Sequence, residues 1–264
     1  MIIRGSENDL IAIEQRGHVR IVRIQNPPDG CIAAKGARQL LTVLADAFVD
    51  HDVRAIVLVG AQPDVFIRHA EVRGIGRAAA ALAEGRIAPA DFANNPFLDL
   101  VERLDRAEKP VIAAINGICM GGGLEIALAC TARIAGRNVK AIGLPEIRID
   151  IIPGAGGMVR LARLIGMHQA RLHVLRGSVL DAVEAHAQGI VDEVADDPFA
   201  AALDLADAIA HRHPAAVTAI MRSFRDGLSS RQSGPTFASV IAEPGVLDRL
   251  ERFISCEERL DQVP

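Results

Sequence analysis

Two glutamates stand beside glycine-rich turns in this 264-residue chain, and both could take part in proton transfer. Glu125 lies in the apolar stretch LEIALAC, directly after the glycine triplet 121–123. Glu146 lies in the segment LPEIRIDIIPGAGG at 144–157, where PGAGG forms a second glycine-rich turn. Two carboxyl groups that face one substrate can divide general acid and general base work between them. The pair is therefore the first candidate for a catalytic site.

The glycine triplet could also bring backbone amides close to a ligand. Glycine has no Cβ, so the chain can approach a bound group closely, and amides at a helix start favour negative charge. The structural alternative is that the glycines aid packing and that Glu125 caps its own helix as a first-turn acid. For Glu146 the alternative is a surface acid at a strand end, and the nearby Asp150 could simply be solvated. Spacing alone leaves both interpretations open.

A third candidate is the segment VFIRHAEV at 65–72, which directly follows the apolar run RAIVLVG. Arg68 and His69 stand where a parallel-sheet protein places its ligand-binding loops. The alternative is a structural histidine, because the sequence shows no obvious partner for His69.

These motifs need a scaffold, and the chain supplies alternating strands and helices. Alternating patterns at 10–15 and 18–25 predict a β-hairpin, and NPPDG at 26–30 predicts a loop. Continuous apolar runs at 54–60 and 109–117 predict strands that are covered on both faces. Further strands are expected at 132–135 and 140–143, and helices at 34–50, from Asn95–Pro96 onward, at 124–130 and after residue 157. The order strand–strand–helix thus occurs at least twice.

The remaining segments differ in character. Residues 71–95 are rich in Ala and Gly without a clean period, which indicates a mobile or partly helical surface. Beyond residue 165 the pattern is almost entirely helical. Helices are expected at about 167–176, 181–188, 198–212, 214–227 and 246–260. No low-complexity linker separates the halves, so we expect the helical part to pack on the core.

Composition excludes several classes of protein. Half of the residues are apolar and 23% are charged, which excludes wholesale disorder. A net charge of −4 without a basic run, and without Trp or Tyr, argues against nucleic-acid binding. The four cysteines lack zinc-site spacing, and no stretch resembles a signal peptide or a comfortable membrane span. We therefore predict a soluble cytoplasmic protein with reduced thiols and no metal site.

Taken together, the motifs resemble the crotonase superfamily, whose best-known member is enoyl-CoA hydratase. The similarity runs from about residue 10 to 225, and it is most specific at 109–166, where KPVIAAING, GGGLE and PEIRIDIIPGAGG occur in the family's order and spacing. It implies an α/β fold with a spiral of ββα repeats over 1–195 and a helical trimerisation region over 196–264, commonly as a dimer of trimers. It also implies an acyl thioester of coenzyme A as substrate, and no cofactor beyond that coenzyme A.

The resemblance implies roles for individual residues. The two catalytic glutamates of the hydratases map to Glu125, assigned to activating water, and to Glu146, assigned to protonating the α-carbon. Their oxyanion hole of backbone amides maps to Ala70 and Gly122. The other substrate-binding positions are Ala33, Arg68, His69, Gly121 and Gly154.

The sequence also departs from the family's pattern. The usual FSAGAD is FIRHAE here, so Arg68 and His69 replace Ala and Gly. The loop must then reach its position without glycine, and histidine tolerates unusual φ angles better than most residues. Leu144 stands where hydratases often have Gln, and the usual FxEKRxPxF ending is absent. These changes concern the identity of the substrate more than the fold.

Hydration is the leading hypothesis, and it has three alternatives. A related isomerase would move the double bond with one carboxylate, whereas two carboxylates favour hydration. A non-catalytic member could keep the trimeric scaffold and bind a partner or RNA. A dinucleotide-binding oxidoreductase fails on pattern, because GICMGGG is not a GxGxxG turn followed by an acid about 20 residues later.

Overall fold

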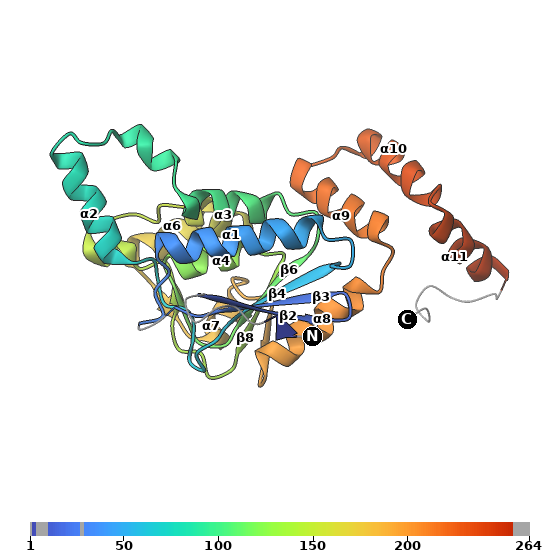
Figure 1. Cartoon of the computed structure of the whole chain (residues 1–264), viewed down its shortest axis with the longest axis horizontal. Coiled ribbons are helices and arrows are strands. Elements are labelled where there is room, and N and C mark those ends of the chain that lie inside the picture. The colour runs from blue at the N-terminus through green and yellow to red at the C-terminus, as the bar shows by residue number, and fades with distance from the viewer. Residues whose placement is uncertain (1, 4–9, 27–28, 256–264) are drawn as a thin grey trace.

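The computed structural model describes residues 2–3, 10–26 and 29–255, and a seven-stranded sheet lies at its centre (Figure 1). From β3 to β11 the neighbouring strands are parallel, and β1 and β2 complete the sheet in antiparallel orientation. In sheet order the strands are β1 (Ile2–Ile3), β2 (Ile11–Arg16), β3 (Val19–Ile24), β4 (Ala55–Gly60), β6 (Val111–Ile115), β8 (Ala132–Gly136) and β11 (Glu193–Ala195). The predicted α/β class is confirmed.

The central strands are buried on both faces because two layers of helices cover the sheet. Side chains alternate between the two faces of a strand. In β4, Ile56 and Leu58 join one apolar cluster, whereas Val57 and Val59 join the other. The first cluster is covered by α1 (Ala34–Val49), α3 (Pro96–Asp105) and α4 (Gly122–Ala129), and the second by α8 (Pro198–Ala210). This double cover explains the continuous apolar runs in the sequence.

A second, smaller sheet makes the fold repetitive. Its order is β10-β9-β7-β5, with β5 (Val65–Ile67), β7 (Ile118–Met120), β9 (Ile142–Gly143) and β10 (Val179–Leu180). Three successive units each send one strand to the large sheet and the next to the small sheet before a helix follows. The predicted ββα repeats are confirmed. The predicted strand at 109–117 is β6. The chain turns tightly after it at Gly117, where a Cβ would lie 1.8 Å from the Asp64 carbonyl carbon, and β7 then begins.

The segment 71–95 contains the regular helix α2 (Val72–Ala83) and the 3-10 helix η1 (Pro89–Ala93). In Figure 1, α2 projects from one end of the molecule. Ala81 is its one buried residue, so no stripe of core residues marks it. Gly74 and Gly76 also weaken the helical signal. These features explain the absence of a clean period.

The C-terminal third is mostly helical, as the sequence predicts, but it also contains the short strands β10 and β11, which the helical pattern does not predict. The helices are α5 (Gly157–Ile165), α6 (Met167–Arg176), α7 (Ala182–Ala187), α8, α9 (Pro214–Asp226), α10 (Ser230–Ile241) and α11 (Pro244–Ser255). The last three extend from the body at the end opposite α2 (Figure 1). Helix α10 was not predicted, because Gly234 and Pro235 interrupt its sequence. Residues 256–260 of the predicted last helix, Cys256 and the Pro-Pro part of the predicted loop at 26–30 lie outside the described residues.

Candidate active site

One cleft is lined by nearly all of the predicted site residues. It has a volume of about 980 Å³ and lies between α2, the start of α3, the turn into α4 and the segment 145–155. Its lining includes Ala33, His69, Ala70, Gly121, Gly122, Glu125, Glu146 and Gly154. The predicted residue missing from its lining is Arg68, and the third acid, Asp150, is exposed outside it. Residues that are far apart in the chain therefore share one space.

Glu125 lies on a helix, α4, that is buried along its whole length, and only 3% of the residue is exposed. Its Oε1 accepts hydrogen bonds from the backbone N–H groups of Ala155 at 2.7 Å and Gly157 at 2.9 Å. The carboxyl group thus binds the turn that opens α5 rather than capping its own helix. Burial raises the pKa of Glu125, while the two amides and the charge of Arg160 act in the opposite direction.

Glu146 begins the 3-10 helix η2 (Glu146–Ile149), which follows β9. It is half-buried and lines the cleft, so it is not a solvated surface acid. Among the described residues, none donates a hydrogen bond to its buried Oε2. Burial, aided by the charge of Glu125, raises the pKa of Glu146 to about 7. The carboxyl group is therefore partly protonated near neutral pH.

The raised pKa of Glu146 predicts that stability depends on pH. An acid with a raised pKa in the folded state binds more protons there than in the unfolded chain. The folded state therefore loses stability as pH rises from the unfolded pKa of 4.5 through the folded value of about 7. Glu146→Gln removes this loss, so urea unfolding favours the variant over wild type more at about pH 8 than at about pH 5. The exposed Asp150→Asn is the matched control, and an equal difference at both pH values for Glu146→Gln contradicts the prediction.

The backbone amides of Ala70 and Gly122 lie close together in the same cleft. A Cβ added to Gly122 would lie 3.2 Å from the Ala70 nitrogen. The N–H of Glu71 and the carbonyl of His69 both bond to Ile32, so the N–H of Ala70 points to the opposite side of the chain. Gly122 is the first residue of α4, where N–H groups lack partners within the helix. Among the described residues, neither N–H has an acceptor.

The altered loop is held by the segment 29–32. Arg68 donates from its backbone N–H to the Gly30 carbonyl and from Nε to the Asp29 carbonyl, at 2.8 and 2.7 Å. His69 Nδ1 lies 2.7 Å from the Ala70 carbonyl oxygen and 3.5 Å from Cys31 Sγ. Cys31 is thus the partner that sequence could not supply. The loop does not use an unusual φ at His69, since Asp150 is the one described non-glycine residue with positive φ.

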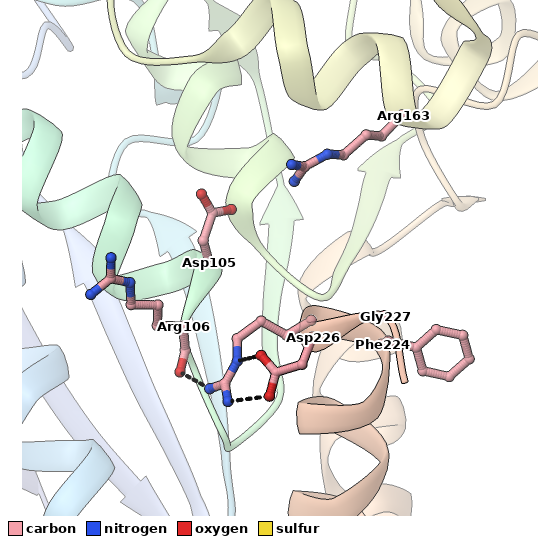
Figure 2. A pocket seen from close by; sticks show the side chains of 7 residues that line it. Asp105, Arg106, Arg163, Phe224, Asp226 and Gly227 are labelled. Atoms are coloured by element: carbon pink, nitrogen blue, oxygen red, sulfur yellow. Dashed lines mark hydrogen bonds and ion pairs between the residues drawn. The ribbon is translucent and has the colours of Figure 1, made fainter. Parts of the chain in front are cut away.

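A second hollow, of about 900 Å³, lies between the end of α3, α5 and the end of α9 (Figure 2). It shares no lining residue with the cleft, and Asp226 in it is paired with Arg225. Within the described ranges, no group of His, Cys, Asp and Glu could hold a metal ion. No helix in the same ranges is long and apolar enough to cross a bilayer.

Comparison with known proteins shows to which family the chain belongs. The family model for enoyl-CoA hydratase/isomerase matches residues 14–239. The chain belongs to the enoyl-CoA hydratase/isomerase family. The predicted membership of the crotonase superfamily is thereby confirmed.

Several solved structures share this family's fold over nearly the whole chain. An enoyl-CoA hydratase from Bacillus anthracis is 28% identical, with a TM-score of 0.84 over 94% of this chain and 96% of that one. An enoyl-CoA hydratase from Thermoplasma volcanium is 30% identical, with a TM-score of 0.81 over 92% and 97%. DspI from Pseudomonas aeruginosa is 29% identical, with a TM-score of 0.75 over 97% and 98%.

Within this enoyl-CoA hydratase/isomerase fold, sequence reasoning missed the apolar wall of the cleft. The wall is formed by Val72, Ile75, Phe92, Phe97, Ile149 and Ile152, among others. The Phe97 ring lies close to Gly122, because a Cβ on Gly122 would lie 2.9 Å from the Cζ of that ring. No period in the sequence marks the wall residues, because they come from four separate segments.

Proposed function

We propose that this family member is an enoyl-CoA hydratase that adds water across the 2,3 double bond of an acyl-CoA thioester. One observation carries the proposal: one cleft holds two carboxyl groups and two backbone N–H groups for which the described part of the chain offers no acceptor. Hydration of a double bond conjugated to a thioester builds negative charge on the carbonyl oxygen. In the proposed complex, the amides of Ala70 and Gly122 stabilise that charge. In another enzyme, removing one oxyanion-hole donor raises the activation free energy by about 2.7–4 kcal/mol.

The two glutamates divide the proton transfers. Glu125 is held through Oε1 by two amides, so its second oxygen is available to orient and deprotonate water. Glu146 has a pKa of about 7, which suits a group that must be protonated to deliver a proton to the α-carbon. Two nearby carboxyl groups oppose each other's ionisation, and this favours one proton shared by the pair. We adopt these roles as the working mechanism.

The apolar wall suits the acyl part of the substrate, whose burial against such side chains is favourable. The reaction requires no cofactor, since coenzyme A belongs to the substrate. The predictions of no nucleic-acid or membrane partner, of a cytoplasmic location and of a boundary near residue 195 stay predictions from the sequence.

A product assay tests the proposed reaction. Purified protein incubated with crotonyl-CoA is expected to give 3-hydroxybutyryl-CoA. An isomerase, the second candidate within this family, would instead move the double bond of a 3-enoyl-CoA and form no hydroxyacyl product. Inactivity toward a range of acyl-CoA thioesters would contradict both and favour a non-catalytic binding protein.

We also propose that the chain assembles as a homotrimer or a dimer of trimers. Helices α9 to α11 expose large apolar side chains, with Phe224 87%, Phe237 66% and Ile254 74% exposed. Surfaces of this kind mark sites of protein–protein contact. Light scattering is expected to give the molar mass of three or six chains, and a monomer would contradict the proposal.

A further inference from the structure

We propose that Asp105 and Arg160 form a positioning pair that fixes the carboxyl group of Glu125 through the turn at 154–157. The inference rests on the proposed function for the role of Glu125. Neither residue lines the cleft, so the pair would act on catalysis without touching the substrate.

Arg160 is only 8% exposed, although it carries a charge and lies on α5. Its Nε donates to Asp105 Oδ1 at 2.9 Å, and its Nη2 donates to Asp105 Oδ2. Asp105 is the last residue of α3, at the edge of the second hollow (Figure 2). A bidentate ion pair of this kind fixes the plane of the guanidinium group. The remaining nitrogen, Nη1, donates to the Ala155 carbonyl oxygen at 2.5 Å.

The turn is therefore held from both sides. On one side the Ala155 carbonyl accepts from Arg160, and on the other the N–H groups of Ala155 and Gly157 donate to Glu125 Oε1. Between them, Gly156 has φ +79°, and a Cβ there would lie 2.8 Å from Arg160 Nη1. The guanidinium group thus lies directly against the turn. Any shift of Arg160 moves the two amides that orient the proposed base.

The test compares two ion pairs that each contain one buried arginine. Asp105→Asn and Arg160→Lys are expected to lower kcat for hydration of crotonyl-CoA by about 100-fold, because a small misplacement of a catalytic group has an effect of this size. KM should stay nearly constant, since neither residue lines the cleft. The matched control is Asp192→Asn, whose carboxylate pairs with Arg133, itself 4% exposed, at 2.7 Å. It is expected to keep kcat.

A pH profile separates positioning from general loss of stability. The charged side chain that acts on the pKa of Glu125 is Arg160, and Glu125 in turn acts on the pKa of Glu146. Arg160→Met removes the positive charge, so the pKa of Glu125 rises and the acid limb of kcat moves to higher pH. Arg160→Lys keeps a charge, so a smaller movement is expected.

Hydrogen exchange gives a readout that needs no substrate. In Asp105→Asn and Arg160→Lys, the amides of Ala155 and Gly157 are expected to exchange faster than in wild type and in Asp192→Asn. If exchange and kcat stay unchanged in both variants while Glu125→Gln impairs hydration, the positioning role is wrong and the proposed function stands. An equal loss of kcat in Asp192→Asn also overturns it. If the wild type does not hydrate any acyl-CoA thioester, the proposed function fails. Hydrogen exchange at Ala155 and Gly157 alone then tests the positioning pair.

Discussion

Replacing Glu146 with glutamine is expected to lower kcat for hydration of crotonyl-CoA by about 10²–10⁴-fold, the usual contribution of general acid–base catalysis. Glutamine keeps the size of the side chain and a hydrogen-bonding group but cannot give up a proton at neutral pH. Glu125→Gln is expected to have an effect of the same order, because an amide cannot deprotonate water. In both variants the thioester should still bind, since the cleft and the two backbone amides are unchanged.

The matched control is Asp150→Asn, which removes an acid four residues from Glu146 outside the cleft. Its kcat is expected to equal that of wild type. Steady-state kinetics and a binding assay with a non-reactive acyl-CoA separate turnover from affinity. Unchanged turnover in both Glu125→Gln and Glu146→Gln removes the assignment of the two glutamates.

Gly122→Ala is expected to lower kcat by about 10²–10³-fold, the loss seen when one oxyanion donor is removed. The added Cβ would lie 2.9 Å from Phe97 Cζ and 3.2 Å from both the Cβ and the nitrogen of Ala70. These contacts are tight, so we expect the Phe97 ring to move aside and the loop at Ala70 to shift by a few tenths of an ångström away from the start of α4. In the proposed complex, the two amides would then no longer point at the same thioester oxygen.

Gly234→Ala is the control for this substitution because Gly234 lies on α10, outside the cleft, and a Cβ there meets nothing within 4 Å. It should keep kcat within a few-fold of wild type. Thermal unfolding of both variants checks that each remains folded. Equal activity of Gly122→Ala and Gly234→Ala would show that the Gly122 amide is not an essential donor.

The large sheet and its helices could be predicted because they obey simple periodicities. The apolar run containing β4 is continuous since helices cover both faces of the sheet, and Leu40 and Leu44 of α1 are buried at helical spacing. The small sheet could not be predicted in full, because two- and three-residue strands are too short to carry a period. The segment 71–95 could be predicted only as mobile or partly helical, because the apolar side chains of α2 face the cleft rather than the core.

The candidate site was predictable where chemistry and spacing coincide and not where it depends on distant contacts. Glu125 and Glu146 stand out because acids are rare within apolar and glycine-rich segments. The amides that hold Glu125 lie 30 and 32 residues away in the sequence, so no local pattern could reveal them. For the same reason the sequence could not predict that Cys31 contacts His69 or that Arg160 contacts the turn at 154–157.

A crystal structure with a bound acyl-CoA analogue tests the central claim most directly. We expect the thioester oxygen within hydrogen-bonding distance of the N–H groups of both Ala70 and Gly122. The carboxyl groups of Glu125 and Glu146 should flank the α- and β-carbons of the acyl chain. A thioester bound elsewhere, or one whose oxygen contacts neither amide, would contradict the account.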